Sequence, residues 1–264
     1  MCGIVGVLGG AFSSLKTVFE QLLYVDALRG PHSTGIAFLN NNYVQVIKDA
    51  VSPDELAYYK RYAKAMNKTH LGLLGHNRYK TVGDIKKENA HPFNHGKITL
   101  VHNGTLYSKF ALFKDKEFET DSEAICASIN EWGIDDVWSK IEDQHGAGTI
   151  CFWDAKAKNF NIISNGNRPL FFSFVKDNEG MVFVSEAWMY TGICDRNDIA
   201  LQYNPKGNCL YYPEKNRLYT FTVGQDRKVS VSSRDIKRPV RQTFNRGNTS
   251  YGHYGYDDGW YMRR

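Results

Sequence analysis

The chain has 264 residues, of which 42% are hydrophobic and 14% aromatic, enough for a sizeable core in one large domain or two small ones. This composition excludes a disordered chain, and no apolar run is long enough for a membrane span or resembles a leader, which predicts a cytoplasmic protein. Residues 233–264 carry +4 of the +5 net charge, so any argument from charge for nucleic-acid binding applies to this tail alone.

The first part of the chain mixes short apolar runs with two helical patterns. Cys2–Leu8 is typical of a buried strand, and apolar residues at helical spacing predict a helix over Ser14–Leu28. Runs on either side of the turn-prone Asn40–Asn42 predict a hairpin. The capping box Ser52–Glu55, with proline at the first helical position, predicts a helix of about a dozen residues.

The remainder of the chain is predicted to consist mainly of strands. Two of them, Leu71–Arg78 and Lys97–Gly104, end in polar motifs. A second capping box, Thr120–Glu123, opens a helix that runs toward Trp132, and Asp135–Ile141 predicts another helix. Six β-branched and aromatic runs separated by turn residues then predict strands over 149–154, 160–164, 169–174, 181–185, 209–212 and 218–223.

This order of elements favours an α+β protein. Hairpins and antiparallel runs, with helices in clumps, lack the regular alternation of a parallel sheet and suit two antiparallel sheets covered by helices. We expect one domain over residues 1–232. Residues 233–264 are rich in Arg, Asn, Gly and Tyr without apolar periodicity, and we expect a flexible appendage there.

The five cysteines indicate a reducing compartment, because their number is odd and they form no CxxC pair or metal-like spacing. Four of them, Cys126, Cys151, Cys194 and Cys209, lie on apolar faces and are expected in the core. Cys2 differs, since removal of Met1 would give this residue both a thiol and a free α-amine.

Polar residues gather where predicted strands end, in five short stretches. Each stretch alone is ordinary, because an HNG can be a tight turn, a TDSE is first a helix cap, and an arginine after a strand is usually solvated. The stretches are "LRGPHSTG" (28–35), "GHNRYKTVG" (75–83), "AHPF" (90–93), "VHNG" (101–104) and "ETDSE" (119–123).

Taken together with the opening "MCGIVG", these stretches resemble the glutaminase domain of class II glutamine amidotransferases, which are N-terminal-nucleophile hydrolases. The motifs occur in the family's order, and the resemblance covers roughly residues 2–225, including weaker echoes in "GNRPLFF" (166–172) and "FVSEA" (183–187). It implies a four-layer αββα sandwich, hydrolysis of the side-chain amide of L-glutamine to glutamate and ammonia, and no cofactor.

The resemblance implies a nucleophile and an oxyanion hole. Cys2 would attack the amide and form a thioester, with its own α-amine carrying the proton, since a thiol pKa of ~8.5 and an amine pKa of about 8 are both near neutrality. Asn103, through its side-chain amide, and Gly104, through its backbone N–H, would stabilise the oxyanion.

The resemblance also implies a substrate pocket. Arg78 would clamp the α-carboxylate of glutamine, Asp121 would accept its ammonium group, and Tyr79 and Thr81 would line the pocket. Arg29 would pack near the nucleophile.

Three histidines, His76, His91 and His102, match family positions. They are expected to be hydrogen-bonded scaffold at strand ends rather than metal ligands. Four positions depart from the family's pattern beside the expected pocket. Pro31 and His32 replace an aromatic or His followed by an acid, Tyr79 replaces the commoner Trp, and Val82 stands where a polar residue is frequent.

Three functions remain open from the sequence. The leading one is a stand-alone glutaminase subunit that passes ammonia to a separate synthase or synthetase. A second is a simple γ-glutamyl amide hydrolase without a partner. A third is a non-catalytic module that holds nucleic acid through the basic, aromatic tail, which is alternatively a disordered end or a docking strap for the partner.

Overall fold

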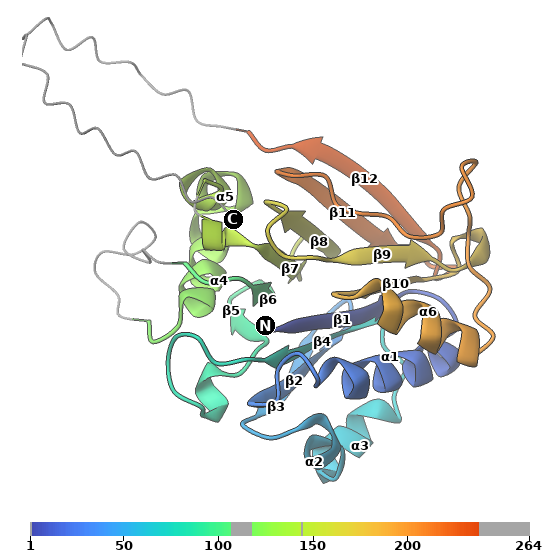
Figure 1. Cartoon of the computed structure of the whole chain (residues 1–264), viewed down its shortest axis with the longest axis horizontal. Helices are drawn as coiled ribbons and strands as arrows, with labels where there is room; N and C mark the ends of the chain where they lie inside the picture. The colour runs from blue at the N-terminus through green and yellow to red at the C-terminus, as the bar shows by residue number, and fades with distance from the viewer. Residues whose placement is uncertain (1, 107–117, 144, 238–264) are drawn as a thin grey trace, which may run out of the picture.

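Two six-stranded antiparallel sheets stack face to face in the computed structural model, which describes residues 2–106, 118–143 and 145–237 (Figure 1). The first sheet has the order β3 (Val44–Asp49), β2 (Ser33–Leu39), β4 (Gly72–Arg78), β1 (Gly3–Leu8), β10 (Met181–Val184), β9 (Phe171–Phe174). The second has the order β12 (Val229–Asp235), β11 (Arg217–Val223), β8 (Asn159–Ser164), β7 (Thr149–Asp154), β6 (Ile98–Asn103), β5 (Phe93–His95).

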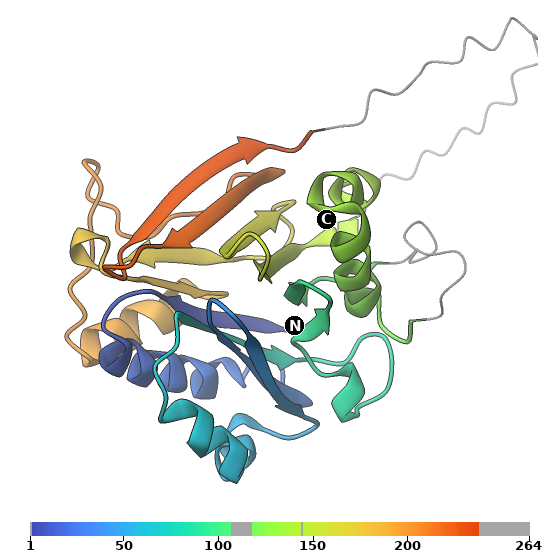
Figure 2. The same cartoon turned by 180° about the vertical axis from the view of Figure 1, so that it is seen from behind.

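Helices cover the outer face of each sheet, as both views show (Figures 1 and 2). The first sheet is covered by α1 (Phe12–Asp26), α2 (Pro53–Ala57), α3 (Lys60–Met66) and α6 (Ala187–Arg196). The second is covered by α4 (Asp121–Trp132) and α5 (Ile134–Ile141). The predicted αββα sandwich of two antiparallel sheets is therefore confirmed.

Strand β1 shows how the apolar pattern builds these layers. Its side chains alternate, so Ile4 and Leu8 belong to the core between the sheets, whereas Val5 and Val7 pack toward α1. Both faces of this strand are buried because the sheet is covered on both sides, which explains its continuous apolar run. The strand is thus fixed in the middle of the first sheet, between β4 and β10.

Several element predictions need correction. The helix expected over Ser14–Leu28 begins and ends two residues earlier. The single helix expected after Ser52 is two short helices, because Tyr59 adopts an extended conformation and caps the second one. No strand forms over 209–212, where Tyr211 makes only an isolated bridge with Phe172. Strands β5 and β12 and helix α6 were not predicted.

The domain boundary expected after residue 232 falls inside β12, which continues to Asp235. The end of this strand is fixed to α5, because the Arg234 guanidinium pairs with both carboxylate oxygens of Asp135 at 2.7 Å. The backbone N–H of Lys237 also donates to Asp135, at 2.7 Å. The folded region thus reaches Lys237, and the predictions for the tail beyond it lie outside the described residues.

None of the helices in the described part of the chain is long and apolar enough to cross a membrane.

Candidate active site

The antiparallel pairing of β1 with β4 places the start of one strand beside the end of the other. Gly3 lies opposite Asn77, so Cys2 and Arg78 lie at the same end of these two neighbouring strands. Strand β6 of the second sheet contacts both strands across the interface between the sheets, and its end carries Asn103. The site therefore forms where strand ends from both sheets meet the start of α4.

A narrow hollow of about 260 Å³ lies at this meeting point. It brings together seven of the predicted site residues, while Asn103, Arg29 and His76 lie outside its lining. The lining residues are Cys2, Arg78, Tyr79, Thr81, Val82, His91, His102, Gly104, Thr120, Asp121 and Ser122.

The Cys2 thiol is 9% exposed and contacts the backbone of Tyr79. The Tyr79 N–H donates to Sγ at 3.3 Å, and the thiol donates back to the Tyr79 carbonyl at 3.4 Å. Burial raises the pKa of the Cys2 thiol, and the Tyr79 N–H and the nearby Arg78 charge only partly oppose this effect. The thiol therefore holds its proton at neutral pH and requires a base to become a nucleophile.

Asn103 and Gly104 follow each other at the end of β6. The Asn103 side chain is 2% exposed, and its Nδ2 has no hydrogen-bond partner among the described residues. A buried amide donor without a partner is costly, so it is typical of a group kept for a ligand. Gly104 has no room for a side chain, because a β-carbon there would collide with the His102 ring and the Gly146 carbonyl.

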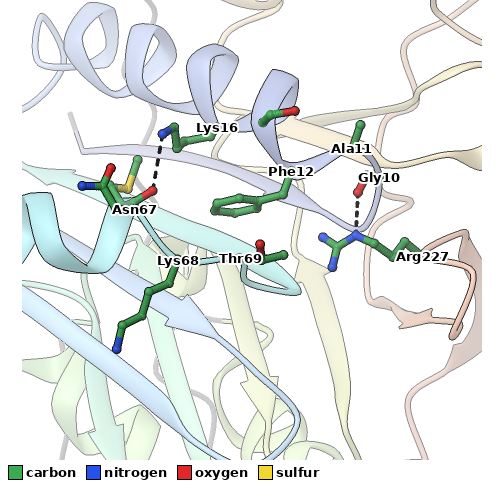
Figure 3. Close-up of a pocket in the computed structure, with 10 residues that line it drawn as sticks. Gly10, Ala11, Phe12, Lys16, Asn67, Lys68, Thr69 and Arg227 are labelled. Atoms are coloured by element: carbon green, nitrogen blue, oxygen red, sulfur yellow. Dashed lines mark hydrogen bonds between the residues drawn. The ribbon is translucent and has the colours of Figure 1, made fainter.

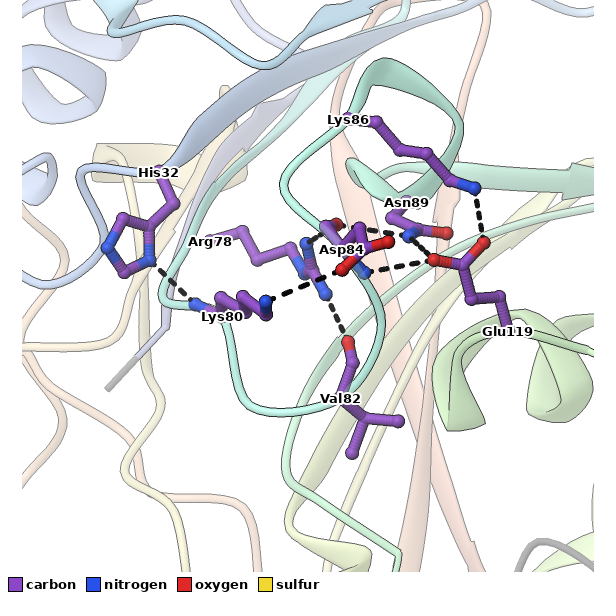
Figure 4. Close-up of polar contacts among 8 residues, drawn as sticks. All are labelled: His32, Arg78, Lys80, Val82, Asp84, Lys86, Asn89 and Glu119. Atoms are coloured by element: carbon purple, nitrogen blue, oxygen red, sulfur yellow. Dashed lines mark hydrogen bonds and ion pairs between the residues drawn. The ribbon is translucent and has the colours of Figure 1, made fainter.

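Arg78 and Asp121 both line the hollow, and both are buried. The Arg78 guanidinium donates to the carbonyls of Asp84, at 3.0 Å, and Val82 (Figure 4). Asp121 is 4% exposed and accepts the N–H of Leu106 at 2.7 Å and that of Ser122 at 3.0 Å. These contacts hold Arg78 in place at the end of β4 and Asp121 at the start of α4.

The capping box that begins α4 is half formed. The Thr120 side chain accepts the N–H of Glu123 at 3.3 Å, as predicted. The Glu123 carboxylate, however, lies 3.3 Å from the His95 ring. The cap fixes the first turn of α4, which carries Asp121 and Ser122 into the hollow.

The three histidines differ in their contacts. His102 bonds to the Ser122 hydroxyl at 3.0 Å and to the Ala147 carbonyl at 2.9 Å, and His76 bonds to the His102 carbonyl at 3.3 Å. His91 stacks near His76 with ring centroids 4.0 Å apart, yet neither of its ring nitrogens has a partner among the described residues. The expectation of a hydrogen-bonded scaffold is therefore wrong for His91. Burial lowers the pKa of all three, which keeps the rings neutral.

Arg29 supports the backbone of Cys2, together with a partner that the sequence analysis did not single out. Its Nε donates to the Cys2 carbonyl at 3.0 Å, and its Nη1 pairs with the Glu186 carboxylate. Glu186 lies in the "FVSEA" echo, which was the available signal for this role.

Asp26, at the end of α1, is a second unpredicted residue. Its fully buried carboxylate accepts the Asn77 side-chain N–H at 3.1 Å, and a β-carbon on Gly3 would collide with it. Burial raises the pKa of Asp26 to about 7, although Asn77 and Arg29 oppose the shift. The residue after Cys2 must therefore be glycine for this carboxyl to fit.

We predict that Asp26→Asn stabilises the fold relative to wild type increasingly as pH rises from about 4 to 7. In that window the folded carboxyl keeps a proton that the unfolded chain has released, so wild-type stability falls with rising pH, by up to about 4 kcal/mol. The asparagine carries no such titration. Urea unfolding at several pH values measures the difference, and a difference that does not change with pH would contradict the prediction.

Two departures from the family pattern contact each other at the edge of the hollow. The rings of His32 and Tyr79 have centroids 4.9 Å apart, and the backbone N–H of Lys80 donates to the His32 Nδ1 at 2.8 Å. The two substitutions thus form one wall segment of the site.

A larger hollow of about 770 Å³ lies away from the motifs, at the start of α1 (Figure 3). Two of its three cationic side chains already have backbone partners: Arg227 donates to the Gly10 carbonyl at 2.6 Å, and Lys16 donates to that of Met66 at 3.4 Å. None of the predicted site residues lines it. Its size alone does not make it the better candidate.

The other four cysteines do not line the hollow, and the described residues form no metal site. Cys126, Cys151 and Cys194 are buried, whereas Cys209 is half-buried and lies outside any strand or helix. Within the described ranges no group of three His, Cys, Asp or Glu side chains is arranged to hold a metal ion.

The fold is similar to that of solved amidotransferases. The structure of glutamine phosphoribosylpyrophosphate amidotransferase from B. subtilis superposes with a TM-score of 0.60 at 19% identity, covering 89% of this chain and 49% of that one. A glutamine aminotransferase class-II domain protein from Silicibacter pomeroyi gives 0.52 at 12% identity, covering 89% of this chain and 100% of that one. The chain thus shares the fold of these solved proteins.

The sequence comparisons specify the family. A family model described as a glutamine amidotransferase domain matches residues 61–216. The chain belongs to this glutamine amidotransferase domain family.

Curated relatives agree with this assignment. The glutamine–fructose-6-phosphate aminotransferase (isomerizing) of Listeria monocytogenes is 31% identical over 199 residues, which are 62% of this chain and 32% of that protein. The Geobacillus kaustophilus enzyme of the same name is 28% identical over 184 residues, with shares of 64% and 30%. The chain spans about a third of the length of the curated relatives it matches.

Proposed function

We propose that this protein hydrolyses the side-chain amide of L-glutamine to glutamate and ammonia, with Cys2 as the covalent nucleophile. The observation that carries the proposal is the single hollow in which Cys2, Arg78, Gly104 and Asp121 meet. These groups supply a thiol, a cation for a carboxylate, an oxyanion donor and an anion for an ammonium group, which are the needs of free glutamine.

The reaction starts with transfer of the thiol proton to a base. Because burial raises the thiol pKa, the α-amine that is exposed when Met1 is removed is proposed to take this proton, directly or through water. Sγ then attacks the amide carbon, and the oxygen gains negative charge beside the Gly104 backbone and the Asn103 Nδ2, which no described residue hydrogen-bonds.

Collapse of this intermediate breaks the carbon–nitrogen bond. The proton held by the α-amine goes to the leaving nitrogen, so ammonia departs and a thioester to Sγ remains. Water then attacks the thioester, gives up a proton to the same amine, and releases glutamate and the free thiol.

We further propose that the ammonia passes to an acceptor on a separate polypeptide. The names of the relatives pair glutamine with an acceptor, fructose-6-phosphate or phosphoribosylpyrophosphate, and those acceptors are properties of those proteins. Affinity purification of the protein from its host, followed by mass spectrometry, tests for a partner. Strong glutaminase activity without any co-purifying enzyme would favour the simple hydrolase instead.

The test of the catalytic proposal combines an activity assay with mapping of the N-terminus. We expect purified full-length protein that begins at Cys2 to release ammonia from glutamine, and a diazoketone analogue of glutamine to add once, at Cys2. Active protein that retains Met1 would overturn the role of the α-amine. Absence of both ammonia release and labelling would leave the non-catalytic binding module as the better reading.

A further inference from the structure

One carboxylate, that of Glu119, holds the loop that follows Arg78 (Figure 4). Its Oε1 accepts the backbone N–H of Asp84 at 2.9 Å and the side-chain N–H of Asn89 at 2.6 Å. Its Oε2 pairs with the Lys86 ammonium group. Three separate points of one loop are therefore fixed to a single side chain.

These contacts lead directly to the Arg78 guanidinium. The Asp84 carbonyl accepts Nη1 of Arg78 at 3.0 Å and also Nδ2 of Asn89 at 3.0 Å. The Val82 carbonyl accepts Nη2 of Arg78. Because Glu119 binds both the N–H of Asp84 and the Asn89 amide, it fixes the peptide group and the side chain that surround this carbonyl.

Glu119 itself does not line the hollow, whereas the next two residues, Thr120 and Asp121, do. The hydrogen bonds that Glu119 accepts and the Lys86 charge lower the pKa of Glu119 to about 2, so this carboxyl is ionised at neutral pH. One short segment thus carries the anion inside the hollow, at Asp121, and the anion outside it that holds the loop of Arg78.

We propose that Glu119 is a positioning residue, which orients the Arg78 guanidinium toward the α-carboxylate of the substrate by fixing the segment around the Asp84 carbonyl that the guanidinium binds. This inference rests on the proposed function, in which Arg78 binds that carboxylate. Through Arg78, Glu119 would make the site select substrates that carry an α-amino-acid group over simple amides.

Two reagents that modify the same thiol test the proposal in full-length protein. The diazoketone analogue of glutamine carries the α-amino-acid head, whereas iodoacetamide is an alkylating agent without a carboxylate. Rates of Cys2 modification by both reagents are measured by mass spectrometry for wild type, Glu119→Ala and Glu119→Gln. Lys80→Ala is the matched control, because it removes an exposed ion pair with the Asp84 side chain on the same loop and leaves the backbone contacts intact.

We expect Glu119→Ala to slow the diazoketone reaction about tenfold, the scale of one lost charged hydrogen bond, with the iodoacetamide rate close to that of wild type. Glu119→Gln should slow it less, because its amide oxygen still accepts the Asp84 N–H. Lys80→Ala should change neither rate.

Equal loss of both rates in Glu119→Ala, or loss of neither, would overturn the positioning role. If the alanine variant does not fold, the ratio of the two rates in Glu119→Gln decides in the same way: a lower ratio supports the role and an unchanged ratio overturns it. A wild-type protein whose Cys2 does not react with the diazoketone would overturn the proposed function first, and this inference with it.

Discussion

Replacement of Cys2 by alanine is expected to reduce ammonia release from glutamine to the assay background. In a well-studied hydrolase, loss of the covalent nucleophile costs on the order of 10⁶ in kcat, and no other described thiol lines the hollow. The side chain is small and sits at the start of β1, so the variant should keep its fold. Ammonia release and mass-spectrometric labelling by the diazoketone, together with a thermal unfolding curve, measure these outcomes.

A matched control for this experiment is Cys209→Ala, which removes a half-buried thiol far from the motifs. It should hydrolyse glutamine and become labelled like wild type. Persistent hydrolysis in Cys2→Ala, or labelling at Cys126, Cys151 or Cys194, would show that the nucleophile is misassigned.

Replacement of Arg78 by lysine is expected to raise KM for glutamine about tenfold or more, with a smaller effect on kcat. Lysine keeps the charge but loses the planar fork, so it cannot bind a carboxylate through two parallel hydrogen bonds or contact the Asp84 and Val82 carbonyls together. The expected loss corresponds to about 1–3 kcal/mol, the value of a hydrogen bond to a charged group. Steady-state kinetics with glutamine measures the change.

The control makes the same substitution at Arg61, an exposed residue of α3 that contacts Asp49 and the Lys48 backbone. Arg61→Lys should leave both kinetic constants unchanged. A KM in Arg78→Lys equal to that of wild type would mean that the substrate carboxylate binds elsewhere.

The elements that the sequence predicts well are those whose signal is local. The apolar run of β1 predicts a buried strand, and the Thr120 cap, which the structure confirms, predicts the start of α4. Strand β12 gave little signal, because only Val229 at its start is buried and the strand lies at a sheet edge. Strand β5 is three residues long, and the break between α2 and α3 depends on the backbone of Tyr59.

The motifs indicated the lining of the candidate site and some of the residues that support it, but not which residues these supports pair with. Cys2, Arg78, Gly104 and Asp121 each belong to a motif, and the structure places them around one hollow. The supporting contacts, such as Arg29 with Glu186 and Glu119 with Asp84, join residues far apart in the chain. They depend on which strand ends become neighbours, and no local pattern records that.

The position of β1 between β4 and β10 bears on the order of events during synthesis. Cys2 lies just before β1, and Val5 of this strand pairs with Val184, so one neighbour of the strand comes from a segment that is synthesised much later. Long-range pairing of this kind forms late in folding. Before residues 181–184 have emerged, β1 lacks its β10 neighbour, so we expect Cys2 to be more accessible at that stage than in the finished sheet. Ribosome-bound chains stopped before Met181 should therefore react with iodoacetamide at Cys2 faster than the finished protein, and equal rates would show that β1 is enclosed without β10.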